Sequence, residues 1–444
     1  MIDLCIKNCK ILSEPSSCSI NIDRGKIIDI TKTPLKAEKT INANNNVVLP
    51  GLIDIHVHFR DPGLTYKEDF KTGSQAAANG GFTTVMDMPN TIPPTNTTKA
   101  FQDKLKIAKQ KSIIDFGLHS GVKNLKEVKK IARLKPASFK LFMDTIDGGF
   151  MQEAFKTISN ISVSEREKCD ESEENNETLR PMITLHAENK DLVYHCTEQM
   201  KSKGENIPGN YAKARPAVAE EVAVAQALAL AYHHNTKIHF CHVSTKKSLE
   251  LISNAKTFMK NISSEITPQH LFLDDSAFEK YGNLAKTNPP LRKYAEKISL
   301  EDLKKIDIIG TDHAPHSLEE KEKNVWEASP GIPNLEVVLK LLLTQYNNGN
   351  IGLKSIERLL CENPARIFNL NTKGFIVKSM DADLVIIDLK EEGSIKSDEF
   401  YTKAHYTPFE GVKYQGAPIM TISRGNVVMD QGQIYENRGQ HIYH

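Results

Sequence analysis

The feature that most constrains the fold is a regular alternation of short apolar runs with helical patterns through the middle of the chain. Most runs are followed by a segment with helical periodicity, such as AVAEEVAVAQALALAYHH (217–234) or NLEVVLKLLLTQY (334–346). Strands that alternate with helices are typical of a parallel sheet covered by helices. Eight such units over roughly 320 residues predict an α/β fold, a (β/α)8 TIM barrel with insertions that spans residues 51–374. The runs, rich in β-branched residues, are GLIDIHVH (51–58), FTTVMDMPN (82–90), IIDFGLHSG (113–121), SFKLFM (138–143), MITLHAE (182–188), KIHFCHVS (237–244), SSEITPQH (263–270) and IDIIGTDHAP (306–315).

The two ends of the chain carry a different pattern, in which strand-like segments are separated by short turns. The turn DRGK lies within the first 50 residues, and RGN and DQGQ lie within the last stretch, which begins near residue 375. Neither end has enough strands to bury a sheet face alone. We therefore expect residues 1–50 and 375–444 to pair into one small β-sandwich domain, which would bring the termini together.

Composition argues against several classes of partner. The net charge is +1 with 25% charged residues, which gives no indication of a nucleic-acid or membrane surface. No apolar run reaches the length of a membrane span, and MIDLCIKNCKIL does not have the form of a signal peptide. The seven cysteines are scattered, which predicts reduced thiols in a cytoplasmic protein. The acidic stretch 162–180 is expected to be a solvated insertion without chemistry.

Residues of the types that bind metals gather at the carboxyl ends of the predicted strands, where the functional sites of such barrels lie. Because side chains alternate along a strand, His56 and His58 point to the same side, and Arg60 follows on that side. A single histidine at a strand end is most often structural, but an H-x-H pair joined by similar residues at other strand ends favours a metal site. The candidate ligands on these grounds are His56, His58, His186, His242 and Asp312.

Two further groups complete the inventory. Lys140 lies inside the fourth run, where an ammonium that faces a crowded metal site would be costly. A carbamate formed with carbon dioxide would make it an anionic oxygen ligand able to bridge two metals. Eight other histidines divide into two sets. We expect packing or supporting roles for His119, His239 and His270, and surface positions for His233, His234, His405, His441 and His444.

The chain resembles the amidohydrolase superfamily and, within it, the class I dihydroorotases. DIHVHFRDPG is similar to the first-strand motif of that family, and GGFTTVMDMPNTIPPT to its second-strand motif. HVST, TNPPLR, GTDHAPH and NPARIF resemble later landmarks, in the same order and nearly from end to end.

The resemblance implies a centre with two divalent metal ions, for which zinc fits the histidine-rich set best, although cobalt or manganese could occupy it. A hydroxide held by both ions would attack the ring carbonyl of a cyclic amide. The implied ligands are His56, His58 and Asp312 for the more buried ion, His186 and His242 for the second, and Lys140, carboxylated on its side-chain nitrogen, between them.

The implied reaction is the interconversion of (S)-dihydroorotate and N-carbamoyl-L-aspartate in pyrimidine biosynthesis. Asp312 would act as general acid and base, passing a proton between the hydroxide and the ring nitrogen. Arg60 offers a planar fork for bidentate pairing with the substrate carboxylate. The family's carboxylate-binding positions correspond to Arg60, Asn90, Asn288 and His316.

Some positions depart from the family pattern. Certain relatives use an aspartate in place of the bridging lysine, and Asp144 and Asp147 lie near Lys140. Lys140 is favoured because it lies within the strand-like run. Asn334 stands where a glycine is common in a stretch whose backbone contacts the substrate ring.

Three other functions compete with this interpretation. An allantoinase or hydantoinase-type cyclic amidohydrolase is disfavoured by Arg60, since those substrates lack the carboxylate. A non-catalytic dihydroorotase-like scaffold would have lost metal ligands, and a metal-free sugar-processing barrel would use the histidines as core residues. The resemblance leaves open a homo-oligomer and an association with aspartate transcarbamoylase.

Overall fold

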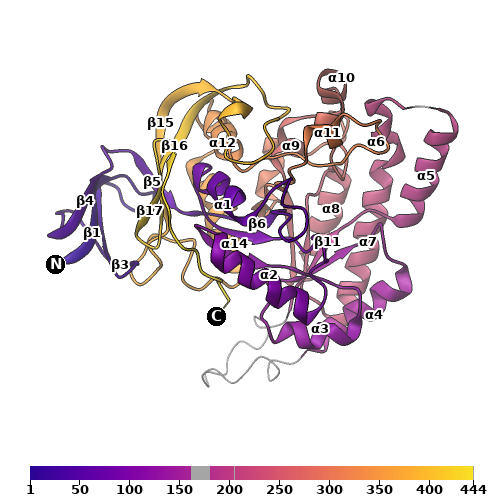
Figure 1. The fold of residues 1–444 in the computed structure, drawn as a ribbon, viewed down its shortest axis with the longest axis horizontal. Coiled ribbons are helices and arrows are strands. Elements are labelled where there is room, and N and C mark those ends of the chain that lie inside the picture. Colours follow the sequence, from indigo (N-terminus) through magenta and orange to yellow (C-terminus); the bar gives the residue numbers. More distant parts are fainter. Residues whose placement is uncertain (162–180, 205, 444) are drawn as a thin grey trace.

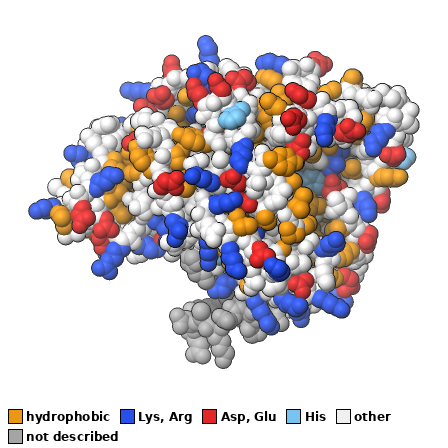
Figure 2. Space-filling view, in the orientation of Figure 1, with side chains coloured by type: hydrophobic (Ala, Val, Ile, Leu, Met, Phe, Trp, Pro, Cys, Tyr) orange, Lys and Arg blue, Asp and Glu red, His pale blue; other side chains and the backbone are white. Residues whose placement is uncertain are grey.

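The computed structural model describes residues 1–161, 181–204 and 206–443, so the predicted acidic insertion at 162–180 lies outside the described residues. Figure 1 shows β-structure on one side of the molecule and a barrel surrounded by helices on the other. On the face drawn in Figure 2, basic and acidic side chains are interspersed, consistent with the net charge of +1.

The barrel contains all eight predicted strands. They form two parallel runs, β6-β7-β8 and β9 to β14 in chain order, and His119 interrupts the third strand between β8 and β9. The ring closes where the His58 N–H donates to the His313 carbonyl at 2.8 Å. The predicted (β/α)8 barrel is therefore confirmed. Its strands are β6 (Leu52–Val57), β7 (Phe82–Asp87), β8 (Asp115–Leu118), β9 (Ser120–Gly121), β10 (Phe139–Phe142), β11 (Ile183–His186), β12 (Ile238–Phe240), β13 (Ile262–Ile266) and β14 (Ile308–Ile309).

Helices follow the strands, and side chains set several of their ends. The Asp69 carboxylate accepts from two backbone N–H groups of the first turn of α1, a normal N-cap. The helix predicted at 217–234 is α7, but α12 begins four residues later than its pattern suggests. At Asn334, where the predicted helix would begin, the side-chain amide donates to Gln269 and to the Thr311 carbonyl. The residues from Asn334 to Val337 therefore lie outside the helix. The helices are α1 (Phe70–Asn79), α2 (Thr98–Lys111), α3 (Leu125–Ala132), α4 (Gly148–Ser159), α5 (Lys190–Ser202), α6 (Tyr211–Ala214), α7 (Ala217–His234), α8 (Lys246–Ala255), α9 (Pro268–Phe272), α10 (Ala277–Tyr281), α11 (Leu318–Lys321), α12 (Val338–Asn347), α13 (Leu353–Glu357) and α14 (Asn363–Ile367).

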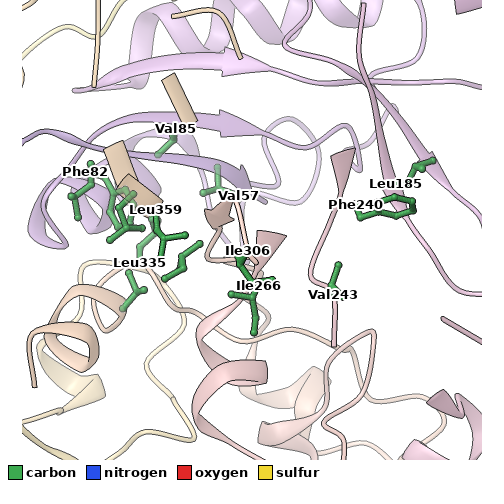
Figure 3. Packing of buried hydrophobic residues seen from close by; sticks show 14 of the residues in the cluster. Val57, Phe82, Val85, Leu185, Phe240, Val243, Ile266, Ile306, Leu335 and Leu359 are labelled. Carbon is green, nitrogen blue, oxygen red and sulfur yellow. The ribbon is translucent and has the colours of Figure 1, made fainter. Parts of the chain in front are cut away.

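One large apolar cluster fills the space between the barrel strands and these helices. Figure 3 shows Leu185 of β11 beside Phe240 of β12, which are paired in register. Phe82 of β7 and Leu359, which follows α13, belong to the same cluster and are completely or almost completely buried. This rigid core fixes the strand ends from which the candidate site residues project.

Two small sheets lie beside the barrel. One has the order β3-β2-β1-β4, and the other has the order β18-β17-β16-β15-β5, in which β5 comes from the first 50 residues. Both sheets contribute to one core, so segments from the two ends of the chain pack together. The assignment of residues 1–50 and 375–444 to a separate domain stays a prediction. The strands are β1 (Ile2–Cys9), β2 (Cys18–Asp23), β3 (Lys26–Thr31), β4 (Ala37–Asn42), β5 (Val47–Pro50), β15 (Leu384–Ser394), β16 (Lys413–Ser423), β17 (Asn426–Asp430) and β18 (Gln433–Ile434).

The last residues of the chain pack against the barrel rather than beside the amino terminus (Figure 1). Phe116 in β8 donates to the Gln440 carbonyl at 2.9 Å and accepts from the Ile442 N–H at 3.0 Å. Gly439 permits this approach, because a Cβ there would lie 1.8 Å from the Ile114 carbonyl oxygen. His441, expected at the surface, is therefore buried.

Two expectations from composition can be compared with the described part of the chain. All six cysteines of that part are free, as predicted. None of its helices combines the length and the apolarity that a membrane span requires.

Candidate metal centre

The residues predicted for metal and substrate binding all line one cavity of about 300 Å³ at the carboxyl ends of the barrel strands. Each comes from a strand end or from the loop that follows, so the parallel sheet gathers residues that are distant in sequence. The ten residues are His56, His58, Arg60, Asn90, Lys140, His186, His242, Asn288, Asp312 and His316.

Asp312 lies between the two histidines of the first strand. Its Oδ1 is 2.9 Å from His58 Nε2 and 3.3 Å from His56 Nε2. Its φ of +45° is in the left-handed region, a sparsely populated conformation that directs the residue away from the path of β14. Burial and then the charge of Arg60 lower the pKa of His58 to about 4, against the opposing effect of Asp312. His58 is therefore a neutral imidazole that can donate a lone pair.

His186 and His242 form the other half of the cluster. His186 Nδ1 lies 3.0 Å from His242 Nε2, so at most one of these two facing nitrogens can carry a proton. Burial, followed by His186 and Lys140, holds the pKa of His242 well below its ordinary value. Nitrogen and oxygen atoms of His56, His242 and Asp312 lie within 4.8 Å of one another and could hold one metal ion.

Lys140 is almost completely buried at this cluster. Its Nζ donates to Cys241 Sγ at 2.9 Å, and it forms no ion pair with any carboxylate of the described residues. An unpaired buried ammonium is expensive. The neutral imidazoles and the carboxylate therefore fit divalent metals, and Lys140 fits a modification that removes its positive charge.

In three of these histidines, one ring nitrogen donates a hydrogen bond to a neighbouring side chain. His58 Nδ1 donates to Asn90 Oδ1 at 2.6 Å, and His186 Nε2 donates to Glu188 at 2.8 Å. His56 Nδ1 donates to Glu265. Such bonds fix the tautomer and leave the opposite ring nitrogen free for a metal. Asn90, predicted at the substrate carboxylate, thus also contacts a predicted ligand.

Sequence reasoning did not single out the two glutamates. Glu188 follows His186 by two residues and is on the same side by strand alternation, so its spacing was a usable signal. Glu265 is the single acid of the strand ISSEI, and its partners come from two other strands.

The two aspartates near Lys140 have other contacts. Asp144 lines the cavity but forms an ion pair with Arg215 at 2.7 Å. Asp147 is exposed and caps α4 by accepting the Phe150 N–H at 2.8 Å. These contacts favour Lys140 over either aspartate as the bridging residue.

Arg60 contributes a buried positive charge to one side of the cavity. Arg60 is buried, its Nε has no hydrogen-bond partner, and it pairs with no carboxylate in the part of the chain that the structure describes. Its Nη2 lies 3.1 Å from His316 Nε2, and Lys67 donates to His316 Nδ1 at 3.2 Å. Burial, then Arg60 and Lys67, keep the pKa of His316 far below its ordinary value. Asn288, on another side, accepts from the Tyr211 hydroxyl at 2.6 Å.

Known proteins resemble this chain over its whole length. A model of the Amidohydrolase family matches residues 47–428. The dihydroorotase of Methanothermobacter thermautotrophicus is 49% identical, with 100% of this chain and 97% of the relative covered. The dihydroorotase of Methanosphaera stadtmanae is 46% identical over 100% of both chains. Among solved structures, the L-hydantoinase of Arthrobacter aurescens matches with a TM-score of 0.92 at 31% identity, covering 100% of both chains. The chain therefore belongs to the amidohydrolase family.

Proposed function

We propose that this protein is a dihydroorotase, which interconverts (S)-dihydroorotate and N-carbamoyl-L-aspartate. The observation that carries the proposal is Arg60, a buried guanidinium that pairs with no carboxylate among residues 1–161, 181–204 and 206–443 and lines the same cavity as the candidate metal ligands. A buried cation of this kind requires an anion, and dihydroorotate carries a fixed carboxylate beside its ring. The full-length identity to two dihydroorotases supports the same substrate.

The substrate carboxylate would pair with the Arg60 fork, with His316 beside it. His316 Nε2 lies 3.1 Å from the Pro330 carbonyl and 3.1 Å from Arg60 Nη2, so the ring packs directly beside the guanidinium that would bind the carboxylate. Lys67 satisfies the other ring nitrogen. Asn90 and Asn288 would supply amide groups from two further sides of the cavity.

We propose that two divalent metal ions, for which zinc fits the histidine-rich set best, are held by His56, His58, His186, His242, Asp312 and an N6-carboxylated Lys140. When bound, two such ions lower the pKa of water and polarise the carbonyl that is attacked.

Asp312 would move the proton in this reaction. In ring opening its carboxylate takes the proton that the attacking water releases and gives it to the ring nitrogen as the C–N bond breaks. In ring closure it takes a proton from the ureido nitrogen and gives it to the carboxyl oxygen that leaves as water when the C–N bond forms. Its contacts with His56 and His58 hold the carboxylate in place for both directions.

The test is an assay of purified protein with dihydroorotate, allantoin and hydantoin side by side. We expect the highest kcat/KM with dihydroorotate and weak turnover of the uncharged rings. A preference for allantoin or hydantoin would overturn the substrate assignment. It would not affect the assignment of the barrel or of the candidate metal ligands.

A hydantoinase-type cyclic amidohydrolase is the second candidate. The fold match to the L-hydantoinase of Arthrobacter aurescens and the 32% identity to the L-hydantoinase of Paenarthrobacter aurescens favour it. Arg60 disfavours it, because an uncharged ring would leave the guanidinium unpaired.

The remaining expectations stay predictions. They are a cytoplasmic location, a homo-oligomer and an association with aspartate transcarbamoylase.

A further inference from the structure

We infer that Glu265 is a positioning residue that serves both metal ions of the proposed centre at once. The inference rests on the binuclear centre of the proposed function and concerns a residue that sequence motifs did not single out. Glu265 lies in β13 and is completely buried. A single oxygen, Oε1, contacts a predicted ligand of the more buried ion and the backbone of a predicted ligand of the second ion.

The first contact is with His56. Its Nδ1–H donates to Glu265 Oε1, which places the remaining lone pair of the ring on Nε2. His56 Nε2 lies 3.3 Å from Asp312 Oδ1, so this lone pair is directed into the ligand cluster. Glu265 thus sets both the tautomer and the direction of the ring.

The second contact is with the backbone of His242. The strand β12 ends at Phe240, and His242 has a φ of +35°, a conformation that few residues with a side chain adopt. Its N–H donates to Glu265 Oε1 at 3.0 Å, and the next N–H, that of Val243, donates to the Glu265 backbone carbonyl at 2.9 Å. Glu265 therefore anchors the turn that brings the His242 ring to within 3.0 Å of His186.

The surroundings leave space for this carboxylate and fix it. A Cβ at Gly310 would lie 2.6 Å from Glu265 Oε2, so a side chain there would displace the glutamate. His239 Nε2 lies 3.3 Å from the same oxygen, and Ser263 holds the other nitrogen of His239 at 2.8 Å. Both carboxylate oxygens therefore have defined partners.

Glu188 provides a matched control within the same centre. It is also completely buried and also accepts from a predicted ligand, His186 at 2.8 Å. Its other recorded partner is Arg215, which is not a predicted ligand. Glu188 thus supports one metal position, whereas Glu265 supports two.

The experiment compares the zinc affinities of wild type, Glu265→Gln and Glu188→Gln without substrate. Each protein is stripped with a chelator and reloaded with Zn²⁺. Metal content per chain is measured, and competition with a chromophoric chelator gives both dissociation constants. Loss of a partner of a metal ligand typically weakens metal binding by roughly ten- to a hundred-fold. For Glu265→Gln, we expect both zinc dissociation constants to rise within this range. For Glu188→Gln, we expect only one of the two constants to rise.

Several results would overturn the inference. Glu265→Gln could bind both ions as tightly as wild type, or weaken only one of them. If Glu265→Gln does not fold, Glu265→Asp keeps the charge but withdraws the oxygen from both partners, and it must show the same double loss. A wild-type protein that binds fewer than two ions would overturn the metal centre together with this inference. A wild type that binds two ions but does not turn over dihydroorotate would overturn the proposed substrate alone.

Discussion

Buried charges gather at both ends of the barrel, and the two clusters differ in how those charges are matched. At the amino end, Asp115 at the start of β8 lies close to Asp381 and Asp383, with ligand atoms within 4.8 Å of one another. Lys373 lies among them, with its Nζ 2.7 Å from Asp115 and 3.3 Å from Asp381. At the carboxyl end, Arg60 and Lys140 are equally buried but have no ion pair with a described carboxylate.

The difference separates a cluster whose charges are compensated within the chain from one that is proposed to bind metal ions and a substrate. Burying a charge is tolerated when an opposite charge and hydrogen bonds compensate it. Lys373 supplies that compensation at the amino end, and Arg424 adds a second cation at 2.8 Å from Asp115. The described residues supply no carboxylate partner to Arg60 or Lys140, so the metal ions, the carboxylated lysine and the substrate carboxylate of the proposed function would complete the carboxyl-end cluster.

The largest effect is expected from Lys140→Ala. Without the residue proposed to bridge the metal ions, metal content and turnover should fall together, and small carboxylic acids should restore part of both. Metal analysis and activity on the same preparation test this, with the wild type stripped by a chelator as the control. A Lys140→Ala protein with unchanged metal content and rate would redirect attention to Asp144.

A smaller loss is expected from Asp312→Asn, which keeps the shape of the side chain but cannot accept the proton. The loss of general acid–base catalysis should lower kcat by roughly a hundred- to ten-thousand-fold while substrate still binds. Single-turnover rates and substrate dissociation constants separate the two effects. A loss of binding as large as the loss of rate would indicate that Asp312 is structural.

Arg60→Gln addresses the unmatched cation directly. Breaking a buried charge pair costs about 2–5 kcal/mol, so kcat/KM on dihydroorotate should fall by roughly thirty- to several-thousand-fold. Arg60→Lys should recover only part, because it lacks the planar fork. Weak hydrolysis of hydantoin serves as the control and should not decrease, and metal content should stay at the wild-type level. Unchanged turnover of dihydroorotate would contradict the assigned role.

Local patterns in the sequence were sufficient for the barrel and for the candidate metal ligands at the strand ends, whereas Asn90, Asn288 and His316 were predicted only from the resemblance to a known family. Strand alternation put His56 and His58 on one side, and strand ends of a parallel barrel necessarily converge. The role of Glu265 could not be predicted from the sequence, because its partners depend on how β13 lies against two other strands. Residues 439–443 dock through hydrogen bonds with the backbone N–H and carbonyl of Phe116. No periodicity in the last residues of the sequence predicts this contact.

The smallest effect on activity is expected from Lys373→Met, which tests the other side of the comparison. Methionine keeps most of the volume but removes the cation, and one unmatched member of a buried ion pair costs about 3–5 kcal/mol of stability. The free energy of unfolding in denaturant should therefore fall by about that amount, while kcat/KM of the folded protein stays at the wild-type value. A large loss of activity without a loss of stability would remove the distinction between the two clusters.

The pH dependence of this variant gives the comparison its sharpest form. Burial raises the pKa of Asp383 and Lys373 opposes that effect, so removing the ammonium raises the pKa of Asp383 further above that of the unfolded chain, and the pKa of Asp381, which Lys373 lowers in the wild type, rises with it. Stability gained from their protonation is present at low pH and is lost as pH rises through the folded pKa, so the deficit should be larger at pH 8 than at pH 5. Asp383→Asn in the same chain should recover part of the lost stability.

Calcium should also raise the Tm of Lys373→Met more than that of wild type, since three carboxylates without their lysine can bind a cation. The amino-end cluster would then behave as the carboxyl-end cluster is proposed to behave, as a buried set of ligands completed from outside the chain.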